Sequence, residues 1–117
     1  MMLKRYCVVI EVQEEHIKEY IDIHKNAWPE LMTAIKESGA ENLIIYNYKK
    51  LSILFYECED IDKFYEIFGE KEIAGKWNAA VHKWFKESPV LDGSGSVDTL
   101  EKIFDLNQQL AGKLEQF

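Results

Sequence analysis

The segment NLIIYNYKKLSILFYECE, residues 42–59, decides the fold of this chain. It contains two runs rich in β-branched and aromatic residues, 42–48 and 51–59, which are separated by Lys49 and Lys50. Such runs are typical of β-strands, and a two-residue connection is typical of a hairpin, although two lysines lack the usual Asn-Gly turn chemistry. The segment therefore predicts two antiparallel strands joined by a tight turn.

The chain before this hairpin predicts a strand followed by helical structure. Residues 3–12, LKRYCVVIEV, alternate with period two, which indicates a strand inside the sheet. From Glu14 to Ser38 the apolar residues recur at helical spacing, and Gly39 follows as a residue that can end a helix. Pro29 has no N–H to donate, so we expect either a kink there or a second helix that begins with the proline.

The chain after the hairpin predicts two helices, a connector and one more strand. Asp60 is a good N-cap for the helix IDKFYEIFG, which Gly69 would end, and another helix is predicted at about residues 71–87. The segment LDGSGSVD, residues 91–98, predicts a flexible connector, because no strand-loop-helix context with a lysine supports a phosphate-binding loop. The segment TLEKIFDL, residues 99–106, then predicts a fourth strand.

The order strand, helix, strand, strand, helices, strand predicts an α+β fold of the ferredoxin-like, split βαβ kind. We expect an antiparallel sheet with its helices on one face, in a single domain spanning residues 1–106, and a C-terminal tail at residues 107–117. Aromatic side chains are spread over both faces of the hairpin. We therefore expect a homodimer of the dimeric α/β barrel type, in which two sheets pack face to face.

The composition excludes several classes of partner. The net charge is −7, from 21 acidic and 14 basic residues, which would repel a phosphate backbone, so we expect no nucleic acid partner. The apolar runs are too short to span a membrane, and the chain does not open with a signal-peptide pattern. Cys7 and Cys58 form no C-x-x-C pair and lie in strand-like runs, so we expect reduced thiols and a cytoplasmic protein.

Three candidate functional residues lie four residues apart in the first predicted helix. At this spacing Tyr20, His24 and Trp28 point to about the same side of the helix. They could be core aromatics around a hydrogen-bonded histidine. They could also line a pocket, because an imidazole exchanges protons near neutral pH, and an indole face and a phenol suit the C–H face and the hydroxyls of a sugar. The spacing alone leaves both interpretations open.

Other kinds of site are less well supported by the sequence. A metal site could combine His16, His24 and His82 with a carboxylate such as Glu57, but no H-E-x-x-H motif or paired Cys/His spacing is present, so we expect no metal. A cysteine nucleophile is equally unsupported, because neither cysteine lies beside a helix N-terminus or an elbow motif.

A longer pattern resembles a known family. The pattern Tyr20-x3-His24-x3-Trp28-Pro29-Glu30-Leu31, followed by SGA at residues 38–40 and N-x-I-I-Y at residues 42–46, resembles the L-rhamnose mutarotase family. The resemblance covers about residues 3–106, and Trp77 is a second anchor, because the family usually carries a tryptophan pair there.

The resemblance implies a small, cofactor-free isomerase that interconverts the α and β anomers of L-rhamnose in a homodimer. It implies that His24 is the catalytic acid/base and that Tyr20 binds the substrate. Trp28 and Trp77 match aromatic residues of the family's pocket. The partner expected from the resemblance is therefore a monosaccharide.

Two positions depart from the family pattern. Leu43 stands where the family has a substrate-contacting tyrosine, and Asn78 stands where it has the second tryptophan of the pair. These changes leave open whether the substrate is L-rhamnose or a related 6-deoxy or aldose sugar, and we add Asn78 to the expected substrate-binding residues. Two rival functions stay open: a non-catalytic sugar-binding or regulatory module, and, by fold analogy alone, a cofactor-free or haem-linked monooxygenase.

Overall fold

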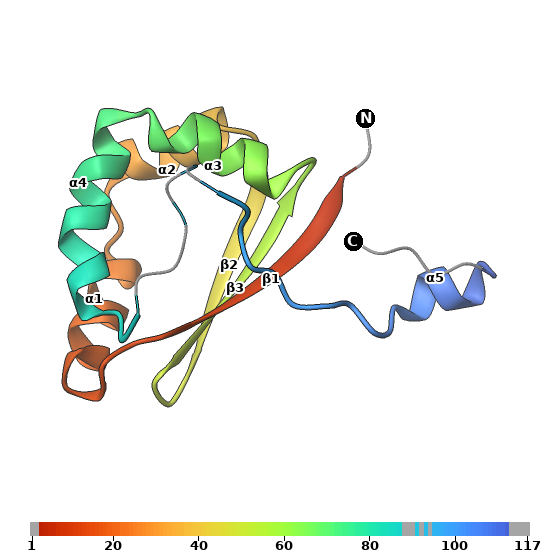
Figure 1. Cartoon of the computed structure of the whole chain (residues 1–117), viewed down its shortest axis with the longest axis horizontal. Helices are drawn as coiled ribbons and strands as arrows, with labels where there is room; N and C mark the ends of the chain where they lie inside the picture. The colour runs from red at the N-terminus through yellow and green to blue at the C-terminus, as the bar shows by residue number, and fades with distance from the viewer. Residues whose placement is uncertain (1–2, 88–90, 92, 94, 113–117) are drawn as a thin grey trace.

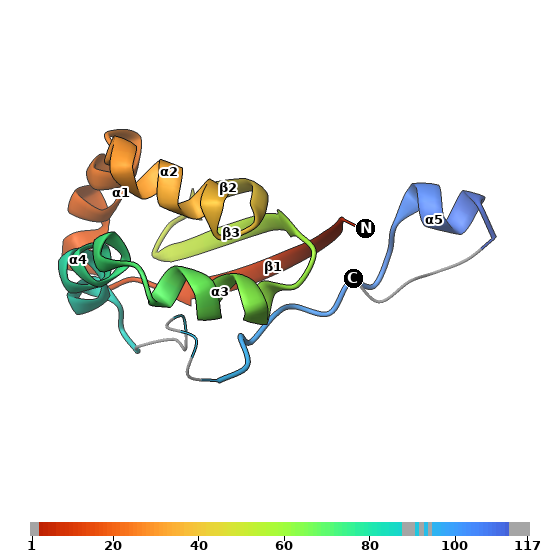
Figure 2. The ribbon, with the colours of Figure 1, turned by 90° about the horizontal axis from the view of Figure 1, so that it is seen from above.

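The computed structural model describes residues 3–87, 91, 93 and 95–112. Its body is a three-stranded antiparallel sheet in the order β1-β3-β2, formed by β1 (Lys4–Glu11), β2 (Ala40–Tyr48) and β3 (Leu51–Cys58). Figure 1 shows the helices α1 to α4 gathered on one face of this sheet, and Figure 2 shows the same layer from above. The predicted α+β class is confirmed, and the order strand, helices, strand, strand, helices follows the split βαβ arrangement up to its last strand.

The hairpin forms as predicted, with a turn that demands an unusual backbone from one lysine. Strands β2 and β3 pair with Tyr48 opposite Leu51, and Lys49 and Lys50 make the turn. Lys49 has a φ of 55°, in the left-handed region that glycine and asparagine adopt more easily. The alternating pattern of the two strands therefore determines this hairpin without help from favourable turn residues.

Pro29 starts a second helix, which is one of the two expected outcomes. A 3₁₀ turn, η1 (Glu14–His16), leads into α1 (Ile17–Lys25), and α2 (Pro29–Glu37) begins with the proline. At this first position the missing N–H costs nothing, because the first N–H groups of a helix have no partner within it. Gly39 follows α2 with a φ of 114°, a conformation that suits glycine at a helix end.

The two helices after the hairpin also form, but the second is shorter than predicted. Asp60 caps α3 (Ile61–Gly69) by accepting hydrogen bonds from the backbone N–H groups of Asp62 and Lys63. Helix α4 (Glu72–Val81) passes into a 3₁₀ turn, η2 (His82–Trp84). The chain is extended at Phe85, where it forms an isolated bridge with Val12 of the region after β1. This pairing explains why the helix does not continue to residue 87.

The prediction of a fourth strand at residues 99–106 was wrong. In the described chain residues 99–105 form no strand, and the short helix α5 (Leu106–Leu110) begins at the end of the predicted segment. The Leu100 N–H donates to the Cys7 carbonyl over 2.8 Å, on the edge of β1 that faces away from β3. In Figure 1 the chain crosses β1 near this contact and then turns away from the sheet. Period-two alternation is insufficient where the segment does not run alongside a partner strand.

The core lies between the sheet and the helices. On the covered face of the sheet Val8 is 3% exposed, Leu54 6% and Tyr56 0%, whereas Tyr46 on the opposite face is 63% exposed. Cys7 and Cys58 are both unpaired thiols. None of the helices in the described part of the chain combines the length and the apolar character needed to cross a membrane.

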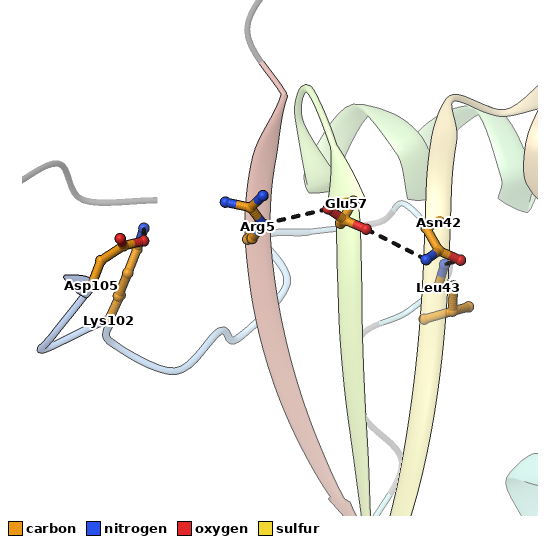
Figure 3. A network of polar contacts seen from close by, with 6 residues as sticks. All are labelled: Arg5, Asn42, Leu43, Glu57, Lys102 and Asp105. Atoms are coloured by element: carbon orange, nitrogen blue, oxygen red, sulfur yellow. Dashed lines mark hydrogen bonds and ion pairs between the residues drawn. The ribbon is translucent and has the colours of Figure 1, made fainter. Parts of the chain in front are cut away.

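Polar side chains link the three strands at one end of the uncovered face. Figure 3 shows Glu57 of β3 between Arg5 of β1 and Asn42 of β2. The Glu57 carboxylate accepts from the Arg5 Nε and from the Asn42 Nδ2, each over 3.4 Å. These contacts are long and partly exposed, so they contribute little to stability. They make this end of the uncovered face polar, whereas Val9, Ile53 and Tyr46 lie side by side farther along the same face.

Candidate active site

A cavity of about 750 Å³ opens between the sheet and the helices. This volume lies in the range typical of small-molecule sites. Helices α1 to α4 and strands β2 and β3 all contribute to its wall. The lining residues used below are Tyr20, His24, Leu43, Tyr56, Phe64, Tyr65, Trp77 and Asn78.

His24 lines the cavity from α1 and brings an imidazole to it. Its Nδ1 lies 2.7 Å from the backbone carbonyl oxygen of Tyr20, one helical turn earlier. Because a carbonyl oxygen only accepts, Nδ1 must carry the proton and donate it in this bond. The neutral ring then keeps a lone pair on Nε2. The helix thus holds His24 in the tautomer that a general base requires.

The environment of His24 favours its neutral form. The ring is half-buried, and this burial lowers the pKa of His24 below its ordinary value, while the hydrogen bond to the Tyr20 carbonyl opposes the shift. The Tyr20 ring lies 4.3 Å from the His24 ring, and the Trp77 ring meets it edge to face at 5.1 Å. Two aromatic rings therefore restrict the orientation of the imidazole.

The side chain of Tyr20 links the site to strand β3. Its side chain is 3% exposed, and its hydroxyl lies 2.7 Å from the Ser52 Oγ of β3, which is 0% exposed. Either hydroxyl can be the donor of this bond. Period-two alternation in β3 places Ser52 on the same covered face as Leu54 and Tyr56. A serine among the apolar residues of this face indicates a buried hydrogen-bond partner, and Ser52 was not among the predicted site residues.

The tryptophans and Asn78 occupy different positions around the cavity. Trp77 and Asn78 of α4 both line it, so α4 brings two predicted residues beside the α1 pair. Trp28 is not among the residues that line the cavity in the described chain; it contacts the Trp77 ring edge to face at 5.1 Å. Trp28 therefore packs against the Trp77 ring and restricts its orientation. Leu43 lines the wall on β2, where it brings no hydroxyl group.

Metal ligation is not indicated by the geometry. Within residues 3–87, 91, 93 and 95–112, no three histidine, cysteine or acidic side chains come together as a metal ion would need. The alternative site of His16, His24, His82 and Glu57 is therefore not assembled. His16 instead pairs with Glu19 over 3.2 Å near the surface, and His82 lines the cavity.

Comparison with known proteins tests the resemblance seen in the sequence. The family model described as rhaM, L-rhamnose mutarotase, matches residues 5–106. The chain belongs to the L-rhamnose mutarotase family. A mutarotase of this family from Listeria monocytogenes is 31% identical over 105 residues, which cover 89% of this chain and 99% of the relative.

Solved structures support the fold of this family member. A crystal structure of L-rhamnose mutarotase from Formosa agariphila matches 88% of this chain and 98% of its own, with a TM-score of 0.67 and 20% identity. A crystal structure from Bordetella bronchiseptica, titled "Putative antibiotic biosynthesis monooxygenase", matches 89% of this chain and 100% of its own with a TM-score of 0.65 and 18% identity. At these identities the likeness shows the fold alone.

Proposed function

We propose that this protein is a mutarotase that interconverts the α and β anomers of L-rhamnose or of a closely related 6-deoxy or aldose sugar. Membership of the L-rhamnose mutarotase family supports an isomerase. The observation that carries the proposal is the placement of His24, whose Nδ1 is held by the Tyr20 carbonyl oxygen and whose side chain lines a cavity of about 750 Å³.

His24 can provide the acid–base chemistry that mutarotation needs. Nε2 takes the proton of the anomeric hydroxyl while the bond between C1 and the ring oxygen breaks, and the ring oxygen receives a proton, either from the imidazolium or through a hydroxyl relay. The open aldehyde rotates about C1–C2 and closes on its other face by the reverse proton transfers. Protons and electrons balance over the cycle, so the proposal requires no cofactor or metal.

The other predicted site residues position the sugar in this proposal. Tyr20 holds the His24 ring and the Ser52 hydroxyl in place, and Trp77 offers an aromatic wall, which Trp28 supports. Asn78 adds an amide to the same wall. An indole face suits the C–H groups of a pyranose, and an amide can both donate to and accept from its hydroxyls.

The rival functions are less well supported. A sugar-binding module would not need an imidazole held in one tautomer. The monooxygenase alternative rests on a shared fold, and the fold alone does not determine the reaction.

The proposal is tested by NMR magnetisation exchange between the anomeric protons, with L-rhamnose, L-fucose and common aldoses. We expect the protein to accelerate exchange for L-rhamnose or one related sugar over the protein-free rate. Folded protein that binds a sugar without accelerating its exchange would support the binding module instead. Haem binding or oxygen consumption, neither of which we expect, would support the monooxygenase.

The pH dependence of anomer exchange should follow the protonation of the His24 imidazole. Catalysis by Nε2 needs the neutral imidazole, which protonation removes as the pH falls. Because burial lowers the pKa of His24, the acid limb of kcat/KM should have its midpoint below about 6.5, the ordinary histidine value. Rates measured with protein, corrected for the protein-free rate at each pH, give this midpoint. A midpoint above the ordinary value would contradict the neutral-base assignment.

A homodimer in the cytoplasm, without a nucleic acid partner, completes the proposal. Free thiols at Cys7 and Cys58 fit a reducing compartment, and the acidic net charge of −7 disfavours nucleic acid. The uncovered sheet face places Val9 and Tyr46 on either side of Ile53, and these two outer side chains are 39% and 63% exposed. An apolar face of this kind is suited to a second copy of the chain.

Sedimentation velocity tests the dimer. The wild-type protein should sediment at about twice the mass of its 13.7 kDa chain. Tyr46→Asp should shift it to the monomer, because the substitution places two equivalent charges in an apolar contact. Thr33→Asp, at an exposed position of α2 on the helical side, is the matched control and should leave the dimer unchanged. A wild-type monomer at micromolar concentration would rule out the proposed dimer.

A further inference from the structure

Two tyrosine hydroxyls meet in the wall of the cavity. Tyr56 of β3 is 0% exposed and Tyr65 of α3 is 6% exposed, and both line the cavity. Their hydroxyl oxygens are hydrogen-bonded to each other. The proposed function assigns neither residue a role, and the matched family pattern described above includes neither.

The two hydroxyl groups cannot use both of their protons in hydrogen bonds to each other. Each tyrosine hydroxyl carries one proton and can accept up to two hydrogen bonds. The bond between Tyr56 and Tyr65 uses one of the two protons, whichever residue donates. No further partner of either hydroxyl is found among the residues that the structure describes. One O–H group, more than nine-tenths buried, is therefore left without an acceptor among these residues. A buried donor without a partner is unfavourable, and both residues belong to the cavity wall, where a ligand oxygen can serve as the acceptor.

The chemistry of the pair selects a neutral oxygen as its ligand. Burial raises the pKa of Tyr56 and of Tyr65 well above the ordinary tyrosine value, so both stay protonated and act as donors rather than as bases. Phe64 and Phe68 surround the pair with apolar surface. An apolar wall with one neutral O–H suits a hydroxyl group on an otherwise apolar ring face and disfavours a charged group.

The tyrosine pair and His24 come from different elements of the cavity wall. Leu43 lies opposite Tyr56 in the register of β2 and β3, so the neighbouring side chain on the wall brings no competing hydroxyl. His24 comes from α1, whereas Tyr65 comes from α3, and Figures 1 and 2 show these helices in different parts of the helical layer. A pyranose whose C1 meets His24 would turn another part of its ring toward the tyrosine pair.

We propose that the hydroxyl pair of Tyr56 and Tyr65 binds a ring hydroxyl of the sugar other than the anomeric one and thereby determines which sugar the site accepts. This inference deepens the proposed function, because it takes the cavity as the sugar site. The pair acts in binding and specificity, and it takes no part in the proton transfers of His24. A site that offers a buried O–H rejects an analogue that lacks the matching hydroxyl.

The test compares L-rhamnose, or whichever sugar the screen identifies, with its analogues that each lack one ring hydroxyl. Binding is measured by titration calorimetry and exchange by NMR, for wild type, Tyr56→Phe, Tyr65→Phe and the double variant. We expect the wild type to bind one analogue about tenfold more weakly than the parent sugar, the size of one buried hydrogen bond. The double variant should bind the parent sugar about tenfold more weakly and lose this discrimination, with kcat little changed.

Tyr6→Phe is the matched control. Tyr6 lies opposite Tyr56 in the register of β1 and β3, and its hydroxyl lies 3.4 Å from the Glu59 carbonyl oxygen, but it is not among the cavity-lining residues. Removing its hydroxyl should leave binding and discrimination unchanged. A general loss of packing would weaken all the sugars alike, whereas the proposed role changes the ranking between the parent sugar and one analogue.

The outcomes separate this inference from the proposed function. Sugar binding without accelerated exchange would defeat the mutarotase proposal, yet the ranking of analogues would still decide the role of the pair. A double variant that keeps wild-type affinity and the wild-type ranking would overturn the inference while leaving the enzyme assignment intact. A wild-type protein that binds none of these sugars would also overturn it.

Discussion

His24→Ala is expected to fold like the wild type and to lose enhanced anomer exchange. General acid–base catalysis by a positioned side chain contributes about 10²- to 10⁴-fold, so the rate over the protein-free exchange should fall by that order. The substitution removes a half-buried ring that contacts Tyr20 and Trp77, but it leaves the Tyr20–Ser52 hydrogen bond in place. NMR magnetisation exchange measures the loss, and circular dichroism with thermal unfolding measures the fold.

His16→Ala provides the matched control for this variant. His16 lies in η1 just before α1 and pairs with Glu19 near the surface, so its removal should leave exchange unchanged. His24→Gln adds a second comparison, because it keeps a polar side chain at the same place without an imidazole. Full activity in folded His24→Ala would refute the acid/base assignment and would redirect the search to the hydroxyls of Tyr20 and Ser52.

Phe64→Ala is expected to cause the largest loss of stability. Phe64 is 3% exposed, and its ring lies 4.9 Å from Tyr65, 5.6 Å from Phe68 and 6.1 Å from Tyr56. Replacing a buried phenylalanine by alanine costs about 3–5 kcal/mol, because transfer free energy is lost and a cavity remains. For a domain with about 5–15 kcal/mol of stability, this is a large fraction of the free energy of unfolding.

Denaturant unfolding measures this effect. The midpoint should move to much lower denaturant while the slope stays the same, provided that unfolding remains two-state. Ile67→Ala is the matched control, since Ile67 lies on the same helix α3 and is 38% exposed. Its cost should be clearly smaller. Equal losses for both variants would show that the aromatic cluster around Phe64 is not the centre of the core.

The local features of the fold could be predicted from sequence because each depends on neighbouring residues. Alternation in β2 and β3 determines the hairpin, the carboxylate of Asp60 caps α3, and Pro29 opens α2. The same locality holds within the site, since Tyr20 and His24 lie one turn apart on a single helix and their rings are in contact. Helical spacing was sufficient to predict this pair.

Features that join distant parts of the chain could not be predicted in this way. The contact between Trp77 and His24 depends on how α4 packs against α1, and the Tyr56–Tyr65 hydrogen bond depends on the docking of α3 on β3. Residues 99–106 alternate like a strand, but a strand also requires a neighbour along its length, and alternation carries no information about that neighbour. The placement of residues 1–106 in one domain stays a prediction. The catalytic role of His24 and the substrate roles of Tyr20, Trp28, Trp77 and Asn78 also stay predictions.

The pairing of β1 with β3 has a consequence for synthesis on the ribosome. Strand β1 emerges first, but Lys4 pairs with Cys58, so β1 has to wait until the distant β3 has left the exit tunnel. Meanwhile Val8 and Ile10, which are only 3% and 4% exposed in the folded chain, have no partner strand to cover them. The hairpin of β2 and β3 is local and can close quickly, whereas β1 joins it only after a long loop has closed. The nascent chain therefore carries an uncovered apolar strand until β3 has emerged, the interval in which chaperones and neighbouring chains can bind it.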